Sequence, residues 1–247
     1  MTEGQEINSL ISSAQADYDS LRFVSQERPC PYLPGKQARS EAYWVDQLDG
    51  STYERMLTRG FRRSGRVVYR PRCRGCSECR QMRVPVESFQ PTRSMRRVLA
   101  RNADVVVEEG RPAPDDERFA VYRRYLDAQH DESMSRGYES FRDFLYDSPT
   151  ETVEFRYRVE GRLMGVSIAD RLPLGLSSVY MYFDPEFSER SPGTFSVLWE
   201  IDYCRRAGMK YYYLGFFVAG STTMSYKSRF RPNDILIGDD RWVSLQA

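Results

Sequence analysis

The stretch Val179–Gly215, VYMYFDPEFSERSPGTFSVLWEIDYCRRAGMKYYYLG, decides the fold. Its aromatic and β-branched start predicts a strand that ends at Asp184-Pro185, and YYYLG predicts a second strand of the buried type. Between them, a proline near the first turn and Gly208 after the last turn delimit a helix. This helix opens with Ser191, Pro192, Gly193 and Thr194, so its first backbone amides are expected to be free to bind an anion or a developing oxyanion. The alternative is an ordinary capped helix.

Three strand-like runs lie before the helix, at 152–161, 162–171 and 174–185, with short turns that predict an antiparallel meander. Meander, crossover helix and strand in this order resemble the acyltransferase fold of the GNAT class. That class usually has a Gly-rich pyrophosphate loop of the form Q/R-x-x-G-x-G/A before the helix. SERSPGT at 188–194 departs from this form, which speaks against acetyl-coenzyme A as the donor.

A Pro-rich joint, EGRPAPDD at 109–116, is the best candidate for a domain boundary. With 247 residues the chain is long enough for two modest domains. We therefore expect an α+β protein in which a smaller α+β N-terminal domain, residues 1–110, precedes a GNAT-like acyltransferase domain, residues 111–247.

Positive charge is concentrated in the first half of the chain. Between Arg55 and Arg101 fourteen arginines face only Glu78 and Glu87, a local net charge of +12 in a protein whose overall charge is +1. This segregation favours a surface that binds a polyanion. The alternative is a bias toward arginine over lysine, which does not explain the missing acids.

The same region holds a cysteine cluster. Cys73, Cys76 and Cys79 follow C-x2-C-x2-C spacing on a loop with Gly75, so their thiols can converge on one ion. A closed zinc site or a four-iron cluster needs a fourth ligand. Cys30, Cys204 and the single histidine, His130, are the candidates, and we expect Cys30 because prolines hold it in a turn of the same domain. The alternative is a set of buried or redox-idle thiols.

Bulk properties narrow the class of protein. The chain has no run of about 18 apolar residues, so no membrane span is expected. Its N-terminus lacks the basic start and apolar run of a signal peptide, and five cysteines are an odd number for a disulfide scaffold. A cytoplasmic location is therefore expected.

Several motifs together resemble the aminoacyl-tRNA–protein transferases, in particular the bacterial aspartate/glutamate leucyltransferases, which are related to the eukaryotic arginyl-tRNA–protein transferases. The resemblance runs from about Leu21 to Leu236. Its motifs are PCPYLPGKQAR, GFRRSGRVVYRPRCRGCSECRQMRVPV, F-x-P-x-R-S-x-R-R, YFDPEF, S-P-G-T and MSYKSRFRP.

The resemblance implies an enzyme that transfers leucine from Leu-tRNA to the N-terminal Asp or Glu of a protein and so marks it for N-degron proteolysis. Charged tRNA, acidic acceptor proteins and a downstream protease adaptor would be its partners, with no organic cofactor. The cysteines of the family match Cys30, Cys73, Cys76 and Cys79, which in arginyl relatives have been associated with an iron–sulfur cluster. Zinc, iron–sulfur or no metal all remain open here.

Site residues follow from the implied reaction. A guanidinium grips a carboxylate through two hydrogen bonds, so the acceptor side chain is assigned to arginines of GFRRSGRVVYR, namely Arg62, Arg63, Arg66 and Arg70. The phosphates of tRNA are assigned to Arg93, Arg96 and Arg97. The chemical centre is assigned to Tyr182, Asp184, Ser191, Gly193, Thr194, Tyr226 and Lys227. Each of three residues has a structural alternative: Tyr182 could be a core residue, Asp184 a turn former before Pro185, and Lys227 a surface charge.

Three alternative functions remain. An arginyl-tRNA–protein transferase would use the same acceptors. A non-catalytic, metal-stabilised RNA-binding protein would explain the arginines and cysteines. It would not explain why the expected meander, helix and strand follow the order of an acyltransferase fold. An acetyl-coenzyme A-dependent acetyltransferase is disfavoured by its missing Gly-rich loop.

Overall fold

A mixed eight-stranded sheet organises most of the chain in this computed structural model, which describes residues 22–129 and 136–245. Its strands in spatial order are β14 (Arg241–Ser244), β13 (Asp234–Ile237), β7 (Arg80–Pro85), β12 (Tyr211–Phe217), β11 (Gly175–Phe183), β10 (Arg162–Arg171), β9 (Thr152–Val159) and β8 (Val106–Gly110). Within the described sheet only β11 and β12 run parallel, since they are joined by a crossover helix.

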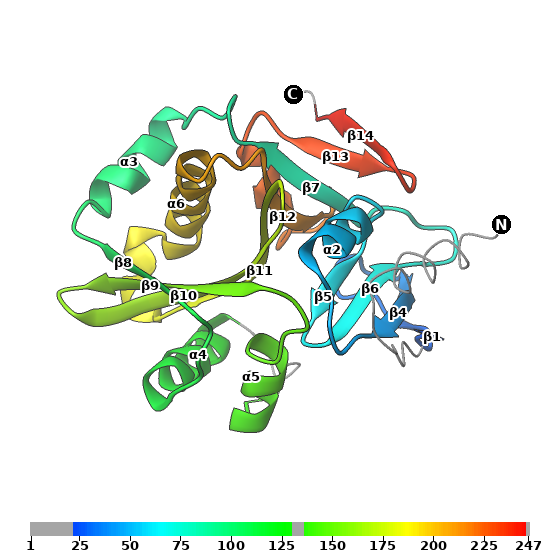
Figure 1. Cartoon of the computed structure of the whole chain (residues 1–247), viewed down its shortest axis with the longest axis horizontal. Helices are drawn as coiled ribbons and strands as arrows, with labels where there is room; N and C mark the ends of the chain where they lie inside the picture. The colour runs from blue at the N-terminus through cyan, green and yellow to red at the C-terminus, as the bar shows by residue number, and fades with distance from the viewer. Residues whose placement is uncertain (1–21, 130–135, 246–247) are drawn as a thin grey trace.

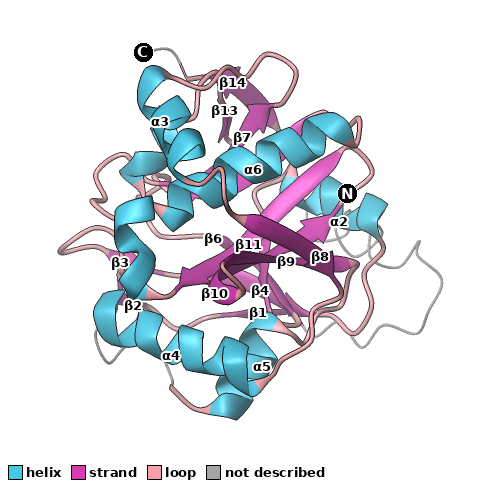
Figure 2. Ribbon diagram, turned by 90° about the vertical axis from the view of Figure 1, so that its left-hand side faces the viewer, coloured by secondary structure: helices cyan, strands magenta, loops and turns pink. Residues whose placement is uncertain are grey.

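Two pairs of helices cover this sheet, one on each face (Figures 1 and 2). The crossover helix α6 (Pro192–Arg206) and helix α3 (Arg93–Arg101) cover one face, where α6 buries Phe195, Ile201 and Cys204. On the other face, α4 (Asp116–Gln129) and α5 (Tyr138–Leu145) enclose a second apolar cluster with β10 and β11. Both sheet faces are therefore buried, as the apolar runs of β10 and β12 predict.

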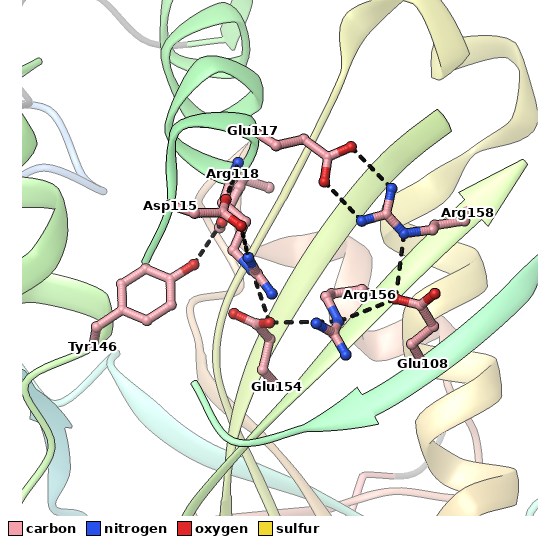
Figure 3. Close-up of polar contacts among 9 residues, drawn as sticks. Glu108, Asp115, Glu117, Arg118, Tyr146, Glu154, Arg156 and Arg158 are labelled. Carbon is pink, nitrogen blue, oxygen red and sulfur yellow. Dashed lines mark hydrogen bonds and ion pairs between the residues drawn. The ribbon is translucent and has the colours of Figure 1, made fainter. Parts of the chain in front are cut away.

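Charge pairs join α4 to the edge of the sheet (Figure 3). Arg118 of α4 donates from Nε to Glu154 Oε1 at 2.9 Å, and the Glu154 side chain is fully buried. Nearer the surface, Arg158 of β9 pairs with Glu117 of α4 at 2.7 Å and with Glu108 of β8 at 3.3 Å. Glu154 is also 3.7 Å from Arg156, and Arg118 also pairs with Asp115, so the buried pair belongs to a network of charges that ties α4 to the sheet.

A smaller four-stranded sheet lies beside the large one, in the order β1 (Arg22–Val24), β4 (Ser40–Trp44), β6 (Val67–Pro71) and β5 (Arg62–Ser64). One of its faces packs with helix α2 (Gly50–Leu57) around Tyr43, Phe61 and Val68, and Tyr213 of β12 joins this cluster. A short hairpin, β2 (Arg28–Pro29) and β3 (Gln37–Ala38), lies before β4 in the chain. Two 3-10 helices, η1 (Pro185–Arg190) and η2 (Ser225–Arg229), complete the described elements.

The α+β class and the order of meander, crossover helix and strand are confirmed. Strands β7 and β8 belong to the large sheet although they come before residue 111, and β7 pairs with β12 along its whole length. The division into 1–110 and 111–247 stays a prediction, and strands from both sides of that position share one hydrogen-bonded sheet.

Candidate functional site

The parallel pair β11–β12 separates at one point, and this point is the centre of the candidate site. The two strands are in register only at Gly175–Tyr211, Leu176–Tyr212 and Ser177–Tyr213. Beyond these pairs β11 continues to Phe183 and β12 continues to Phe217, but the two strands no longer pair with each other. We call this place, at Ser178, Gly215 and Phe216, the strand junction.

Arg62 reaches into the strand junction from β5 of the small sheet. Its Nη2 donates to the carbonyl of Ser178, while its Nη1 is buried and has no hydrogen-bond partner among the described residues. Gly215, with φ of +83°, makes room for it, because a Cβ there would overlap the guanidinium. The residue is only 8% exposed, so a buried cation with a free donor points to where an anionic group could bind.

Helix η2 brings Tyr226 and Lys227 to the same place. Lys227 is buried, and its Nζ donates to the carbonyl of Phe216 at 2.8 Å. Burial and the positive charge of Arg62 lower the pKa of Lys227 to about 7. The ring of Tyr226 is partly exposed, and burial of its hydroxyl raises the pKa while Arg62 opposes the rise. The site therefore combines a fixed cation with an amine that is partly neutral near pH 7.

The depressed pKa of Lys227 gives a testable pH dependence of stability. The pKa lies below the ordinary value of 10.5, so between about pH 7 and 10 the unfolded chain holds a proton that the folded chain has released. The unfolding free energy of the wild type should therefore rise with pH across this window relative to Lys227→Met, and the difference should be constant below it. Urea denaturation of both proteins at several pH values measures the difference, and parallel curves would contradict the burial of a neutral lysine.

The other three arginines assigned to the acceptor are engaged in the fold. Arg63 forms a doubly hydrogen-bonded pair with Asp170, at 2.6 and 2.7 Å, in which both side chains are fully buried. Arg70 donates to Glu41 at 2.8 Å, and Arg66 donates to Asp147 at 2.7 Å. Of the four arginines, Arg62 alone has a buried guanidinium nitrogen without a hydrogen-bond partner among the described residues.

Tyr182 and Asp184 lie away from the strand junction. Tyr182 is fully buried among the aromatic rings of α4 and α5, where its hydroxyl is 2.9 Å from that of Tyr146. Asp184 caps η1 by accepting from the Glu186 amide at 3.2 Å, and it pairs with Arg124 of α4 at 2.7 Å. Both placements match the structural alternatives, a core residue and a turn former.

The start of α6 offers fewer free amides than expected. Ser191 takes a left-handed conformation with φ of 56°, and its carbonyl accepts the amides of Thr194 and Phe195 at 3.0 Å each. Pro192 has no amide hydrogen, so within this described turn only the Gly193 amide lacks a hydrogen-bond partner among the described residues. The catalytic assignments of Ser191, Gly193 and Thr194 remain predictions.

The three arginines assigned to tRNA lie on the exposed side of α3. Arg93, Arg96 and Arg97 are all exposed, and among the described residues none of them forms an ion pair. The end of this helix is attached to the last residue of η1, shortly before α6, because Asn102 Nδ2 donates to the Arg190 carbonyl at 2.8 Å. Any ligand of these arginines would therefore be held in a fixed position relative to the large sheet.

The four clustered cysteines influence one another electrostatically. The pKa of Cys79 is raised to about 12. Burial is the largest cause, and the neighbouring thiols of Cys73, Cys30 and Cys76 add to it. In residues 22–129 and 136–245 no three His, Cys, Asp or Glu side chains have a geometry that holds a metal ion. Cys204 is fully buried in the core beneath α6, and His130 lies outside the described residues.

Comparison with known proteins gives two matching family descriptions. "Arginine-tRNA-protein transferase, N terminus" matches residues 28–97, and "Arginine-tRNA-protein transferase, C terminus" matches residues 117–237. An aspartate/glutamate leucyltransferase of Pseudomonas putida is 38% identical over 226 residues, which cover 90% of this chain and 96% of the relative. The chain belongs to the aspartate/glutamate leucyltransferase family. A leucyltransferase of the same description from Pseudomonas paraeruginosa is 36% identical with the same coverage.

The fold of this leucyltransferase family member is similar to that of FemX. The likeness has a TM-score of 0.51 at 10% sequence identity, and it covers 82% of this chain and 70% of FemX. The expected GNAT-like acyltransferase fold is thereby confirmed. Of the described helices, none is both long and apolar enough to cross a membrane.

Sequence reasoning assigned Arg62, Tyr226 and Lys227 but missed Gly215 and Phe216, which shape the strand junction. One signal was present: a single glycine inside the apolar run YYYLGFF often marks a bulge or a close approach of another group. The register of β12 against β7 indeed shifts between Tyr213 and Gly215.

Proposed function

We propose that this chain transfers leucine from Leu-tRNA to the N-terminal Asp or Glu of acceptor proteins. The observation that carries the proposal is the 38% identity to an aspartate/glutamate leucyltransferase over 90% of the chain. The buried, partly unpaired Arg62 at the strand junction adds a cation for the acceptor's carboxylate. The leucylated protein would then be recognised by an N-degron adaptor in the cytoplasm.

The proposed reaction is the aminolysis of an ester. The acceptor's α-amino nitrogen forms a bond to the leucyl carbonyl carbon, the bond from that carbon to the ribose oxygen breaks, and the amine's proton goes to the ribose oxygen. An α-amine with an ordinary pKa of about 7.7–8.0 is partly neutral near pH 7. Alignment of the amine and the ester can supply about 7–11 kcal/mol, so positioning is the main task of the protein.

Residues at the strand junction are assigned to this task. Arg62 holds the acceptor's carboxylate through its free Nη1, and its charge also disfavours the ammonium form of the nearby amine, as it does for Lys227. Lys227, partly neutral, is assigned to proton transfer, and Tyr226 to contact with the ester or the 3′ end of the tRNA. The N-terminal part, residues 1–110, would supply contacts to the acceptor and to the tRNA. Residues 111–247 would supply the acyltransferase fold.

A transfer assay tests the proposed function. Purified protein is incubated with radiolabelled Leu-tRNA or Arg-tRNA and with peptides that begin with Asp, Glu, Asn or Ala. We expect label in the Asp and Glu peptides from Leu-tRNA alone. Transfer from Arg-tRNA instead would indicate the arginyl activity, and tRNA binding without transfer to any peptide would indicate a non-catalytic RNA-binding protein.

The tRNA surface is assigned to α3. The triple variant with alanine at Arg93, Arg96 and Arg97 should bind tRNA more weakly, and the slope of log affinity against log salt should fall by about 2–3 because counterion release is lost. Filter binding at several salt concentrations measures both, with Arg142→Ala on α5, at the opposite face of the sheet, as the control. An unchanged affinity and slope in the triple variant would move the tRNA surface elsewhere.

The cysteine cluster carries no step of this mechanism, and its role as a zinc or iron–sulfur site stays a prediction from the sequence. If it is correct, protein purified without oxygen should contain zinc or iron. Serine at Cys73, Cys76 or Cys79 should release the metal and lower the melting temperature, because ligation is coupled to folding. Elemental analysis decides the question, with Cys204→Ser as a control for the loss of a buried thiol. Wild-type protein free of both metals would make these residues packing thiols.

A further inference from the structure

Glu200 of α6 carries a carboxyl group in the core that the proposed reaction does not use. The residue is 1% exposed, and three hydroxyl groups donate to it: Ser167 at 2.6 Å and Tyr157 at 2.9 Å to Oε1, and Tyr212 at 2.7 Å to Oε2. Burial raises its pKa, and the three hydroxyl groups oppose the rise. Among the described residues no arginine or lysine forms an ion pair with it. Burying such a group costs free energy that an apolar side chain would not cost, so the cluster is a candidate for a role other than stability.

The Tyr212 hydroxyl connects this carboxyl group to the strand junction. Tyr212 pairs with Leu176 in the parallel ladder, so both side chains lie on the sheet face that α6 covers. Side chains alternate along a strand, so Ser178 shares this face with Leu176. The Ser178 side chain is hydrogen-bonded to the Tyr212 hydroxyl. Because the single hydrogen of that hydroxyl goes to Glu200, the Ser178 hydroxyl is the donor.

The main chain at Ser178 lies where regular strand pairing ends on both sides. The parallel ladder with β12 stops one residue earlier, at the pair Ser177–Tyr213. On the other side Ser178 pairs with Ala169 of β10, directly next to a register shift in that pair of strands. An irregularity of this kind bends a strand and changes the direction of its groups. Two regular ladders therefore do not fix the direction of the Ser178 carbonyl, and a side-chain anchor can.

The orientation of Arg62 depends on this carbonyl. Its Nη2 donates to the Ser178 carbonyl, and this is the only hydrogen bond of the guanidinium to a described residue. Its Nη1, the donor assigned to the acceptor's carboxylate, is free. Since a guanidinium is planar and rigid, the position of Nη1 follows from the position of the group that holds Nη2.

We propose that Tyr212 is a positioning residue for the acceptor. Aligned by Glu200, its hydroxyl holds Ser178, and the Ser178 carbonyl aims the free Nη1 of Arg62 at the acceptor's carboxylate. The inference rests on the proposed function and extends it to core residues that touch no substrate. A carboxylate only accepts hydrogen bonds, so the contacts run in one direction, from Ser178 through Tyr212 to Glu200. A buried polar network with all its members satisfied favours one geometry.

The test compares two variants that each remove one hydroxyl group from the same carboxyl group. Tyr212→Phe breaks the link to Ser178, whereas Tyr157→Phe leaves this link intact and is the matched control. Both should lower the melting temperature by similar amounts, because each loses a buried hydrogen bond. Only Tyr212→Phe should raise the KM for a peptide beginning with Asp, by about three- to tenfold, with the KM for Leu-tRNA within about twofold of wild type. Steady-state transfer with each substrate varied in turn measures the split.

Ser178→Ala removes the same link from its other end and keeps the carbonyl. It should raise the acceptor KM as much as Tyr212→Phe does. The double variant should be no worse than either single variant, because both changes break one contact. Additive effects would overturn the inference. Equal acceptor KM values in Tyr212→Phe and Tyr157→Phe would also overturn it and would make the cluster a support of the core alone.

A nuclear magnetic resonance measurement separates this inference from the proposed function, because it needs no substrate. The Nε–H signal of Arg62, identified by its loss in Arg62→Ala, should shift in Tyr212→Phe and stay in place in Tyr157→Phe. An Arg62 signal that is the same in wild type and in Tyr212→Phe would overturn the inference. Wild-type protein that transfers no leucine to acidic peptides, but shows the expected shift in Tyr212→Phe, would count against the proposed function and not against the positioning of Arg62.

Discussion

Replacing Arg62 by alanine should raise the KM for acceptor peptides that begin with Asp or Glu about 30-fold or more, since truncating one partner of a buried charge pair costs about 2–5 kcal/mol. The KM for Leu-tRNA should change much less, because Arg62 is assigned to the carboxylate of the acceptor and not to the donor. Arg62→Lys should rescue poorly, since a single ammonium cannot both donate to the Ser178 carbonyl, as Nη2 does, and place a second donor where Nη1 lies. Steady-state transfer with each substrate varied in turn measures the split.

Arg66→Ala is the matched control for this experiment. Arg66 comes from the turn that follows β5, but it is partly exposed and already paired with Asp147. Its removal should leave the acceptor KM within about twofold of wild type, as exposed ion pairs contribute little. If Arg66→Ala raised the acceptor KM and Arg62→Ala did not, the acceptor would be held at the outer end of the small sheet.

Replacing Arg63 by alanine should act on stability instead, lowering the unfolding free energy by about 3–5 kcal/mol. The reason is that Asp170 would remain fully buried without its charge partner. Among the described residues only the Thr152 hydroxyl, at 2.7 Å, would remain as a side-chain donor. Asp170→Ala should cost a similar amount. Urea denaturation monitored by circular dichroism measures both variants.

Two further variants make the stability result decisive. Arg74→Ala removes an arginine that is 79% exposed and should change the unfolding free energy by less than about 0.5 kcal/mol. The double variant Arg63→Met, Asp170→Leu should recover much of the loss, because two apolar side chains leave no buried charge. A small loss in Arg63→Ala would contradict a dry, fully paired contact between the two sheets.

The contrast between Arg62 and Arg63 shows what the sequence could and could not predict. The order of elements from β9 to β12 followed from their apolar periodicity and turn residues, and the structure confirms it. Adjacent residues on a strand point to opposite faces, so only one arginine of the pair could face Asp170, 107 residues away in the chain. Local patterns do not reveal which face that partner occupies, so the two arginines could not be told apart.

Pairing between distant segments also could not be predicted from local sequence patterns, and this affected both the predicted domain boundary and the predicted site residues. The position of β7 next to β12 depends on a pairing between segments more than 120 residues apart. The spacing of Cys73, Cys76 and Cys79 predicted a shared site with Cys30; the thiols of Cys73, Cys30 and Cys76 contribute to the raised pKa of Cys79, and the metal site itself stays a prediction. Tyr182 was assigned to the chemical centre, but the face of β11 on which it lies packs against α4 and α5.

The central claim is that Arg62, at the junction of β11 and β12, recognises the acidic side chain of the acceptor. The measurement that tests it most directly is the ratio of kcat/KM for a peptide beginning with Asp to that for the same peptide beginning with Asn, in wild-type protein and in Arg62→Ala. Asn keeps the shape of Asp but not its charge, so the wild-type ratio should be about 100 or more. In Arg62→Ala the ratio should fall toward about 1, because the cation that distinguishes the two side chains is gone. A ratio that stays at its wild-type value in a folded Arg62→Ala protein would contradict the claim and place the carboxylate on another cation.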